Sequence, residues 1–244
     1  MNLRNIKKCY FLIVEFLVSL VSFESIKEFF NDDFGGLVLP FSGEAINDED
    51  WLEYQRLEAD KTVKSINPDD LPSDFCDGAC RLVDEFRQKT VNEEDEWMLY
   101  FDYTTADIIY CFKGIGGKTG GTYEKINFKK RKIASLHNHP KKFYSFPSHE
   151  NFEILEKDFE DYELICSDNN FWIIESKGIL DEKNILRLHR DLHRIFCTIE
   201  NFIKINYSKN MDVGNLIEEL YSEYLLSYLN TNYDNIMICK REYR

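Results

Sequence analysis

The chain has 244 residues, of which 43% are hydrophobic and 15% aromatic, so it can fill a sizeable core and is not a disordered chain. Its net charge of −14 argues against a broad nucleic-acid-binding surface, because neutralising phosphates requires a basic one. Its 7 cysteines are scattered and odd in number, which indicates reduced thiols and a cytoplasmic protein rather than a disulfide framework.

The chain begins with a basic stretch and an apolar run at residues 9–23. This run resembles the core of an export signal, but Glu15 interrupts it and no small-residue cleavage pattern follows. It is also too short to span a bilayer comfortably. We therefore expect a helix that packs on the domain, with no membrane association.

An apolar stretch at residues 34–41 follows a Gly-Gly pair and predicts a short strand. The acidic segment 43–70 predicts a surface helix that ends near Pro68.

The segment 71–90 predicts a helix for which Ser73 or Asp74 can serve as the N-cap. One face of that helix is apolar and consists of Phe75, Ala79, Leu82, Val83 and Phe86.

After residue 92 the sequence consists of short runs rich in aromatic and β-branched residues, which predict strands. These runs are residues 96–103, 107–114, 132–139, 162–167 and 171–178. Between the third and fourth runs, residues 147–161 predict a helix with Ser148 as N-cap and Phe152, Leu155 and Phe159 on one face. This order of elements predicts an α/β (α+β) fold, a mixed sheet flanked by helices.

The last part of the chain predicts two amphipathic helices, at residues 181–205 and 212–230, and a possible edge strand at 235–243. His189 and His193 share a face of the first helix and could chelate a metal ion. Arginines flank both histidines and a third ligand is missing, so we expect a basic exposed stripe there instead.

The most informative stretch is the histidine pair at the end of the third predicted strand. Residues two apart on a strand point to the same side, so His137 and His139 can present their imidazoles together, and Pro140 then ends the strand. Two such histidines form half of a tetrahedral zinc site, and a catalytic zinc typically has three protein ligands and one water.

The spacing after this pair resembles a known motif. Pro140 is followed by seven residues, then Ser148, then two residues and Asn151. The JAB/MPN/JAMM metallopeptidase superfamily has His-x-His-Pro, seven residues, Ser, two residues and Asp, so the stretch is similar at every fixed position except the last. It also resembles the bacterial RadC family and the JAB-like domains of phage and prophage proteins.

The resemblance covers roughly residues 75–178 and implies a JAB/MPN core of the cytidine deaminase-like kind. We therefore divide the chain into an N-terminal extension (1–74), this core (75–178) and a C-terminal helical region (179–244).

The resemblance also implies roles for particular residues. His137 and His139 would bind zinc, and Ser148 would stabilise an oxyanion. A glutamate on an earlier strand would take a proton from the zinc-bound water, since zinc brings the pKa of that water near neutrality. Glu96 is our choice for this base, and Glu94 is the close alternative.

The departure from the motif is Asn151, where the family has Asp. An amide oxygen is a neutral, weak ligand, so the exchange lowers the affinity of the site for a dication. Three outcomes stay open: Asn151 binds zinc through its oxygen, His149 or Glu150 takes its place, or the site holds no metal.

Two main functions follow from these residues. The first is a zinc-binding JAB/MPN-like domain, with metal-dependent hydrolysis of a peptide or isopeptide bond in a protein substrate as its reaction. The second, favoured by Asn151, is a catalytically impaired JAB-fold scaffold or an accessory protein of phage-type assembly. A DNA-associated role, by analogy with RadC, is opposed by the net charge.

Overall fold

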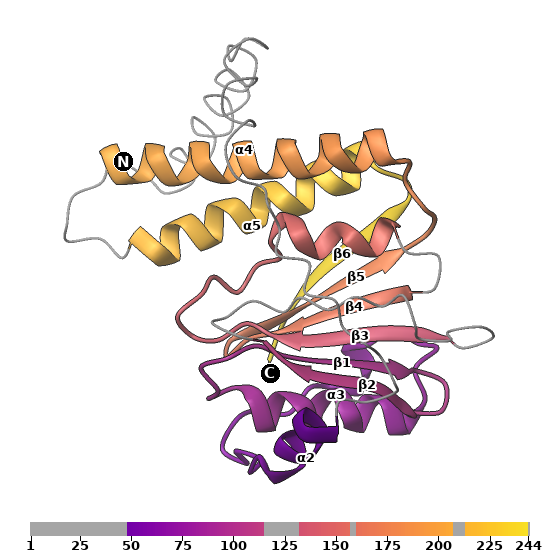
Figure 1. The fold of residues 1–244 in the computed structure, drawn as a ribbon. Helices are drawn as coiled ribbons and strands as arrows, with labels where there is room; N and C mark the ends of the chain where they lie inside the picture. The colour runs from indigo at the N-terminus through magenta and orange to yellow at the C-terminus, as the bar shows by residue number, and fades with distance from the viewer. Residues whose placement is uncertain (1–47, 115–131, 157–159, 207–212, 244) are drawn as a thin grey trace.

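The computed structural model describes residues 48–114, 132–156, 160–206 and 213–243 (Figure 1). The predicted helix at 9–23 and the predicted strand at 34–41 lie outside the described residues.

A six-stranded mixed sheet forms the centre of the molecule, with the strand order β2-β1-β3-β4-β5-β6. The strands are β1 (Trp97–Asp102), β2 (Ile108–Lys113), β3 (Ile133–Asn138), β4 (Glu160–Cys166), β5 (Asn170–Ser176) and β6 (Ile236–Glu242). Strands β3 and β4 are parallel, and every other neighbouring pair is antiparallel. The five predicted strands and the predicted edge strand are thus confirmed, as is the mixed α/β fold class.

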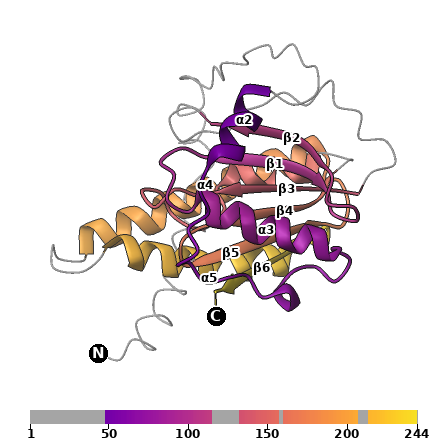
Figure 2. The same ribbon diagram turned by 90° about the horizontal axis from the view of Figure 1, so that it is seen from below.

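Helices cover both faces of this sheet (Figures 1 and 2). One face carries α2 (Asp48–Arg56) and α3 (Asp77–Thr90), with the short 3-10 turn η2 (Pro68–Asp70) between them in sequence. The other face carries η3 (His149–Glu156), α4 (Glu182–Asn206) and α5 (Val213–Asn232). The predicted acidic helix is therefore shorter than expected, since α2 ends well before Pro68.

The predicted N-cap of α3 is wrong. Its N-cap is Cys76, whose Sγ accepts a hydrogen bond from the backbone N–H of Ala79 at 3.3 Å, and not Ser73 or Asp74. Residues 72–75 form a turn that is closed by a backbone hydrogen bond of 3.0 Å. The chain therefore enters the helix two to three residues later than the capping pattern suggested.

The predicted helix after β3 is a 3-10 helix, η3, over residues 149–156. Its i, i+3 geometry places Phe152 and Leu155 on one side, and both are fully buried. Phe159, the third predicted residue of this face, lies outside the described residues.

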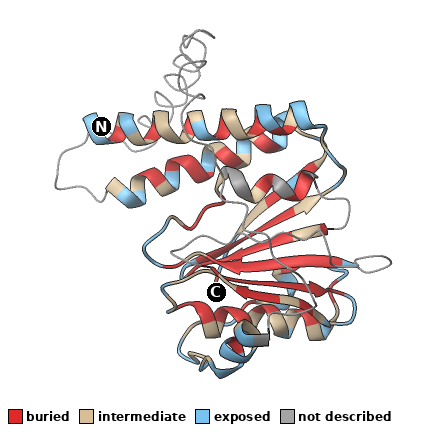
Figure 3. Cartoon of the chain, in the orientation of Figure 1, coloured by how far each residue is buried: buried red, intermediate tan, exposed pale blue. Residues whose placement is uncertain are grey.

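Each face of the sheet carries apolar core residues, and Figure 3 shows the central strands buried between the helix layers. The core on the α5 side contains buried side chains of η3, β4, β5, α4, α5 and β6. The region 179–244 therefore shares both the sheet and a core with the elements before it. No helix in the described part of the chain is long and apolar enough to cross a membrane.

Candidate functional site

The side chains of β3 alternate between two different environments. Leu136 belongs to the apolar core on the α3 side. His137 lies on the opposite face, paired with Met98 of β1 and aligned with Ile165 of β4. His139 follows two residues later on the same side, with its ring centroid 5.1 Å from that of His137 and the two Nε2 atoms 3.2 Å apart. The predicted convergence of the two imidazoles is present.

Asn138, between the two histidines, fixes the end of the strand. Its Oδ1 accepts from the backbone N–H of Trp97 at 2.6 Å, and its Nδ2 lies 3.3 Å from the carbonyl oxygens of Thr90 and Asp95. The side chain is buried with all these partners toward α3. Both flanking imidazoles are thereby directed to the other face of the sheet.

The tautomer of His139 follows from its backbone partner. Nδ1 lies 2.8 Å from the carbonyl oxygen of Tyr144, which can only accept, so Nδ1 carries the proton. Removal from water lowers the pKa of His139 to about 4, against a weaker opposing effect of this hydrogen bond. The neutral ring therefore presents the lone pair of Nε2 to His137.

The orientation of the Asn151 amide is fixed by its neighbours. Its Oδ1 accepts from the backbone N–H of Ser148 at 2.6 Å, and a backbone N–H can only donate. The Nδ2 atom consequently faces the cluster, 3.2 Å from Nε2 of His137 and 3.1 Å from Oε1 of Glu163. Asn151 therefore meets His137 with an N–H group and not with its oxygen.

Glu163, on β4, completes the cluster and was missed by the sequence analysis. Its side chain is 6% exposed, and Oε1 lies 3.4 Å from Nδ1 of His137. A signal existed in the sequence, because Glu163 directly precedes the apolar run Leu164–Cys166. Its significance depends on the parallel register that aligns Glu163 with Ser135 of β3, and the sequence did not reveal that register.

The other predicted residues lie around this cluster. Glu96 is half-buried and directly precedes β1, and alternation along the strand puts it on the face of Met98 and the histidines. Glu94 is exposed in the preceding turn. The side chains of His149 and Glu150, the two suggested substitutes for Asn151, are outside what the structure describes.

The histidine pair fits zinc, and the third position does not. Zn–N bonds of about 2.0–2.1 Å in a tetrahedron separate two ligand nitrogens by about 3.3 Å, close to the observed 3.2 Å. At the third position, however, Asn151 offers Nδ2, whose hydrogens leave no lone pair for a cation. Among the described residues, no three His, Cys, Asp or Glu side chains are arranged to hold a metal ion.

The same atoms form a hydrogen-bonded cluster when one proton lies between the two imidazoles. His137 then donates from Nε2 to Nε2 of His139, and Asn151 donates from Nδ2 to Glu163. In this arrangement the 3.2 Å approach of Asn151 Nδ2 to Nε2 of His137 is a contact and not a hydrogen bond. This assignment of protons follows from the partners of each group. It gives the His139 lone pair a donor and the Asn151 amide an acceptor, which a buried polar cluster requires.

The loop after β3 is anchored by α5. The hydroxyl of Ser145 donates to Oε1 of Glu218, and its backbone N–H lies 3.4 Å from Oε2 of the same carboxylate. Asn170 of β5 donates from Nδ2 to the Ser145 hydroxyl at 2.9 Å. Tyr144, whose carbonyl fixes His139, stacks on Phe146 with ring centroids 4.9 Å apart. The C-terminal helices thus hold the loop that determines the tautomer of His139.

No protein-family model, curated protein or solved structure matches the chain. The similarity to the JAB/MPN/JAMM superfamily therefore depends on the motif from His137 to Asn151 and on its strand-then-helix setting.

Proposed function

We propose that this chain is a JAB/MPN-like domain in which hydrogen bonding has replaced metal coordination, and that it acts as a non-catalytic protein-binding module. One observation carries the proposal: Asn151 gives its oxygen to Ser148 and turns its N–H group toward His137. The residue at the position of the family's third ligand thus presents an N–H group, whereas a zinc site needs a ligand atom with a free lone pair.

The energetics of the Asn151 amide support this assignment. A metal could bind Oδ1 only if the amide rotated by half a turn. The N–H groups of Nδ2 would then face the backbone N–H of Ser148, and Oδ1 would face the carboxylate of Glu163. Leaving a buried donor without an acceptor costs about 1–3 kcal/mol, and opposing two acceptors adds to that cost. The amide orientation that excludes the metal is therefore the stable one.

A second candidate is a zinc-dependent peptidase or isopeptidase acting on a protein substrate. It is favoured by the spacing of the two Nε2 atoms, which suits zinc, and by the presence of Glu96 on the histidine face of the sheet. This candidate requires a third ligand other than the amide as it is now oriented.

Metal content distinguishes the two candidates. The purified, tag-free chain is equilibrated with zinc, dialysed and measured by mass spectrometry alongside Asn151→Asp and the double variant Asn151→Asp/His137→Ala. We expect little zinc in the natural chain, about one zinc per chain in Asn151→Asp, and its loss in the double variant. A carboxylate at this position can accept from Ser148 and offer its second oxygen to the metal.

The opposite result would establish the second candidate. About one zinc per chain in the natural protein, lost on His137→Ala alone, would show that the site is complete with Asn151. A screen for peptide and isopeptide hydrolysis would then follow, with Glu96→Gln as the variant that retains metal and loses activity.

A further inference from the structure

A second polar cluster lies far along the chain from the histidines, on α4. Asp191 is only 8% exposed, yet it is the meeting point of three arginines, Arg187, Arg190 and Arg194, with nitrogen–oxygen distances of 3.7, 3.5 and 3.9 Å. The hydroxyl of Tyr228, on α5, donates to Oδ2 of the same aspartate at 3.2 Å. The basic stripe predicted to be simply exposed is thus partly organised around a buried acid.

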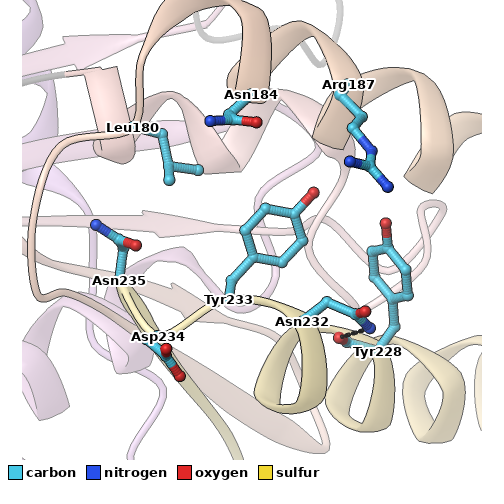
Figure 4. Close-up of a pocket in the computed structure, with 8 residues that line it drawn as sticks. All are labelled: Leu180, Asn184, Arg187, Tyr228, Asn232, Tyr233, Asp234 and Asn235. Carbon is cyan, nitrogen blue, oxygen red and sulfur yellow. Dashed lines mark hydrogen bonds between the residues drawn. The ribbon is translucent and has the colours of Figure 1, made fainter.

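Two members of this cluster, Arg187 and Tyr228, line a cavity of about 390 Å³ between the start of α4 and the end of α5 (Figure 4). That volume is in the range of small-molecule sites. The lining is mainly polar and includes Asn184, Arg187, Tyr228, Asn232, Tyr233 and Asn235.

Several donors of the lining are directed into the same space. Figure 4 shows the guanidinium of Arg187 and the hydroxyl of Tyr233 pointing into the gap between the two helices, with the amide oxygen of Asn184 on the same side. The Nδ2 atom of Asn184 donates to Oδ2 of Asp181 at 2.9 Å. The carboxylate of Asp234, the acidic residue of the lining, points away from that gap. Arg187 and Tyr233 therefore present donors where a ligand would sit.

Buried Asp191 contacts two side chains of the lining, Arg187 and Tyr228. It accepts from Tyr228 and lies on the Nε side of Arg187, so it restrains two lining side chains before any ligand arrives. Such restraint reduces the entropy lost when a ligand binds.

We propose that this cavity is a binding site for a small ligand that carries an oxyanion, a carboxylate or a phosphate group. The fork of Arg187 binds one edge of the anion, since guanidinium geometry matches both groups. Tyr233 supplies a further hydrogen bond from the facing wall, and its ring packs against the rest of the ligand. This site is separate from the histidine cluster and does not depend on whether that cluster binds a metal.

The test is an NMR titration of the full chain with inorganic phosphate and, separately, with acetate at constant ionic strength. We expect saturable shifts confined to the residues of the cavity with at least one of the two probes. Saturation by phosphate alone assigns the site to phosphate-bearing ligands, and saturation by acetate alone assigns it to carboxylates.

Matched variants test the role of the guanidinium. Arg187→Gln should weaken binding of the effective probe about tenfold or more, as expected for loss of a charge-assisted pair of hydrogen bonds. Arg190→Gln is the control, because Arg190 also contacts Asp191 but does not line the cavity, and it should change affinity less than about twofold. Tyr233→Phe should weaken binding severalfold and provides a second test if Arg187→Gln does not fold.

The proposal is overturned if neither probe gives saturable shifts at the cavity. If Arg187→Gln and Arg190→Gln lowered the affinity for the probe equally, the proposal would also be overturned. Such a result would indicate general electrostatic attraction and not binding at this cavity.

Discussion

The two faces of the central strands differ in composition although alternate residues of the same short segments form them. Toward α3, β1 and β3 present the apolar side chains Trp97, Leu99, Phe101, Ala134 and Leu136, and among the described residues of these two strands the one polar side chain there is Asn138 at the end of β3. Toward η3 and α5, the alternate positions of the same strands include Asp102, Ser135 and His137 among apolar neighbours, and all three are buried.

The two faces of one strand therefore stabilise the protein in different ways. An apolar face stabilises by burial of surface and needs no particular partner for any one atom. A buried polar group costs free energy unless it has a partner, and on the other face Glu163, Asn151 and the loop carbonyl of Tyr144 surround the histidines. The polar face is therefore where a change of one residue alters function, and the apolar face is where it alters folding.

The largest effect should come from the apolar face. Leu136 is fully buried, and Leu136→Ala should lower the free energy of unfolding by about 2–5 kcal/mol through lost burial and a cavity. Urea denaturation followed by tryptophan fluorescence measures this, since Trp97 and Trp172 are buried in the two cores.

Ser135→Ala is the matched control on the adjacent residue and the opposite face. Its buried hydroxyl makes no hydrogen bond with any residue that the structure describes. Removing an unpaired polar group should leave stability unchanged or raise it by up to about 1 kcal/mol. If Ser135→Ala destabilised the chain as much as Leu136→Ala, the contrast between the two faces would be wrong.

The sequence predicted the apolar face well and the polar face only in part. Alternation in β1 and β3 and the spacing of Ala79, Val83 and Phe86 on α3 were visible in the sequence, because burial follows the period of the backbone. The histidine pair was visible for the same reason.

The partners of the histidines were harder to predict because they come from distant segments. Glu163 joins the cluster through a parallel strand register, and Tyr144 joins it through the path of a loop. The side of Asn151 that faces His137 depends on a backbone N–H, that of Ser148, which no side-chain pattern encodes. Patterns predict which residues share a face, but hydrogen-bond partners depend on tertiary geometry.

A loss of stability of intermediate size is expected when the contact between α5 and the loop after β3 is weakened. Glu218 accepts from both the hydroxyl and the backbone N–H of Ser145, and in Glu218→Gln the new amide group faces a donor. We expect a loss of about 2 kcal/mol in stability, typical of hydrogen bonds to a charged group. We also expect long-range ¹H–¹⁵N NMR to show a smaller population of the His139 tautomer protonated at Nδ1, because Tyr144 is less firmly placed.

The exposed neighbour Glu219 supplies the control for this experiment. Glu219→Gln changes the same charge on the same helix and should leave the tautomer of His139 as it is. An unchanged tautomer in Glu218→Gln as well would mean that the loop is held by its aromatic packing, such as the contact of Phe146 with Tyr221 at 4.4 Å, and not by Glu218.

The smallest effect concerns Asp102, at the far end of β1 from the histidines. Burial raises the pKa of Asp102, but hydrogen bonds from Thr104 and from the backbone N–H of Lys132 outweigh it and hold the pKa below its usual value. A carboxyl group whose pKa is lower in the folded state stabilises the fold above its unfolded pKa of about 3.9, and this contribution is lost as the pH falls. Asp102→Asn should therefore be less stable than the natural chain by about 0.5–1 kcal/mol at pH 7, with the deficit shrinking toward pH 3. Urea midpoints at the two pH values measure this, and an equal deficit at both would show that the carboxylate charge has no part in the stability of the polar face.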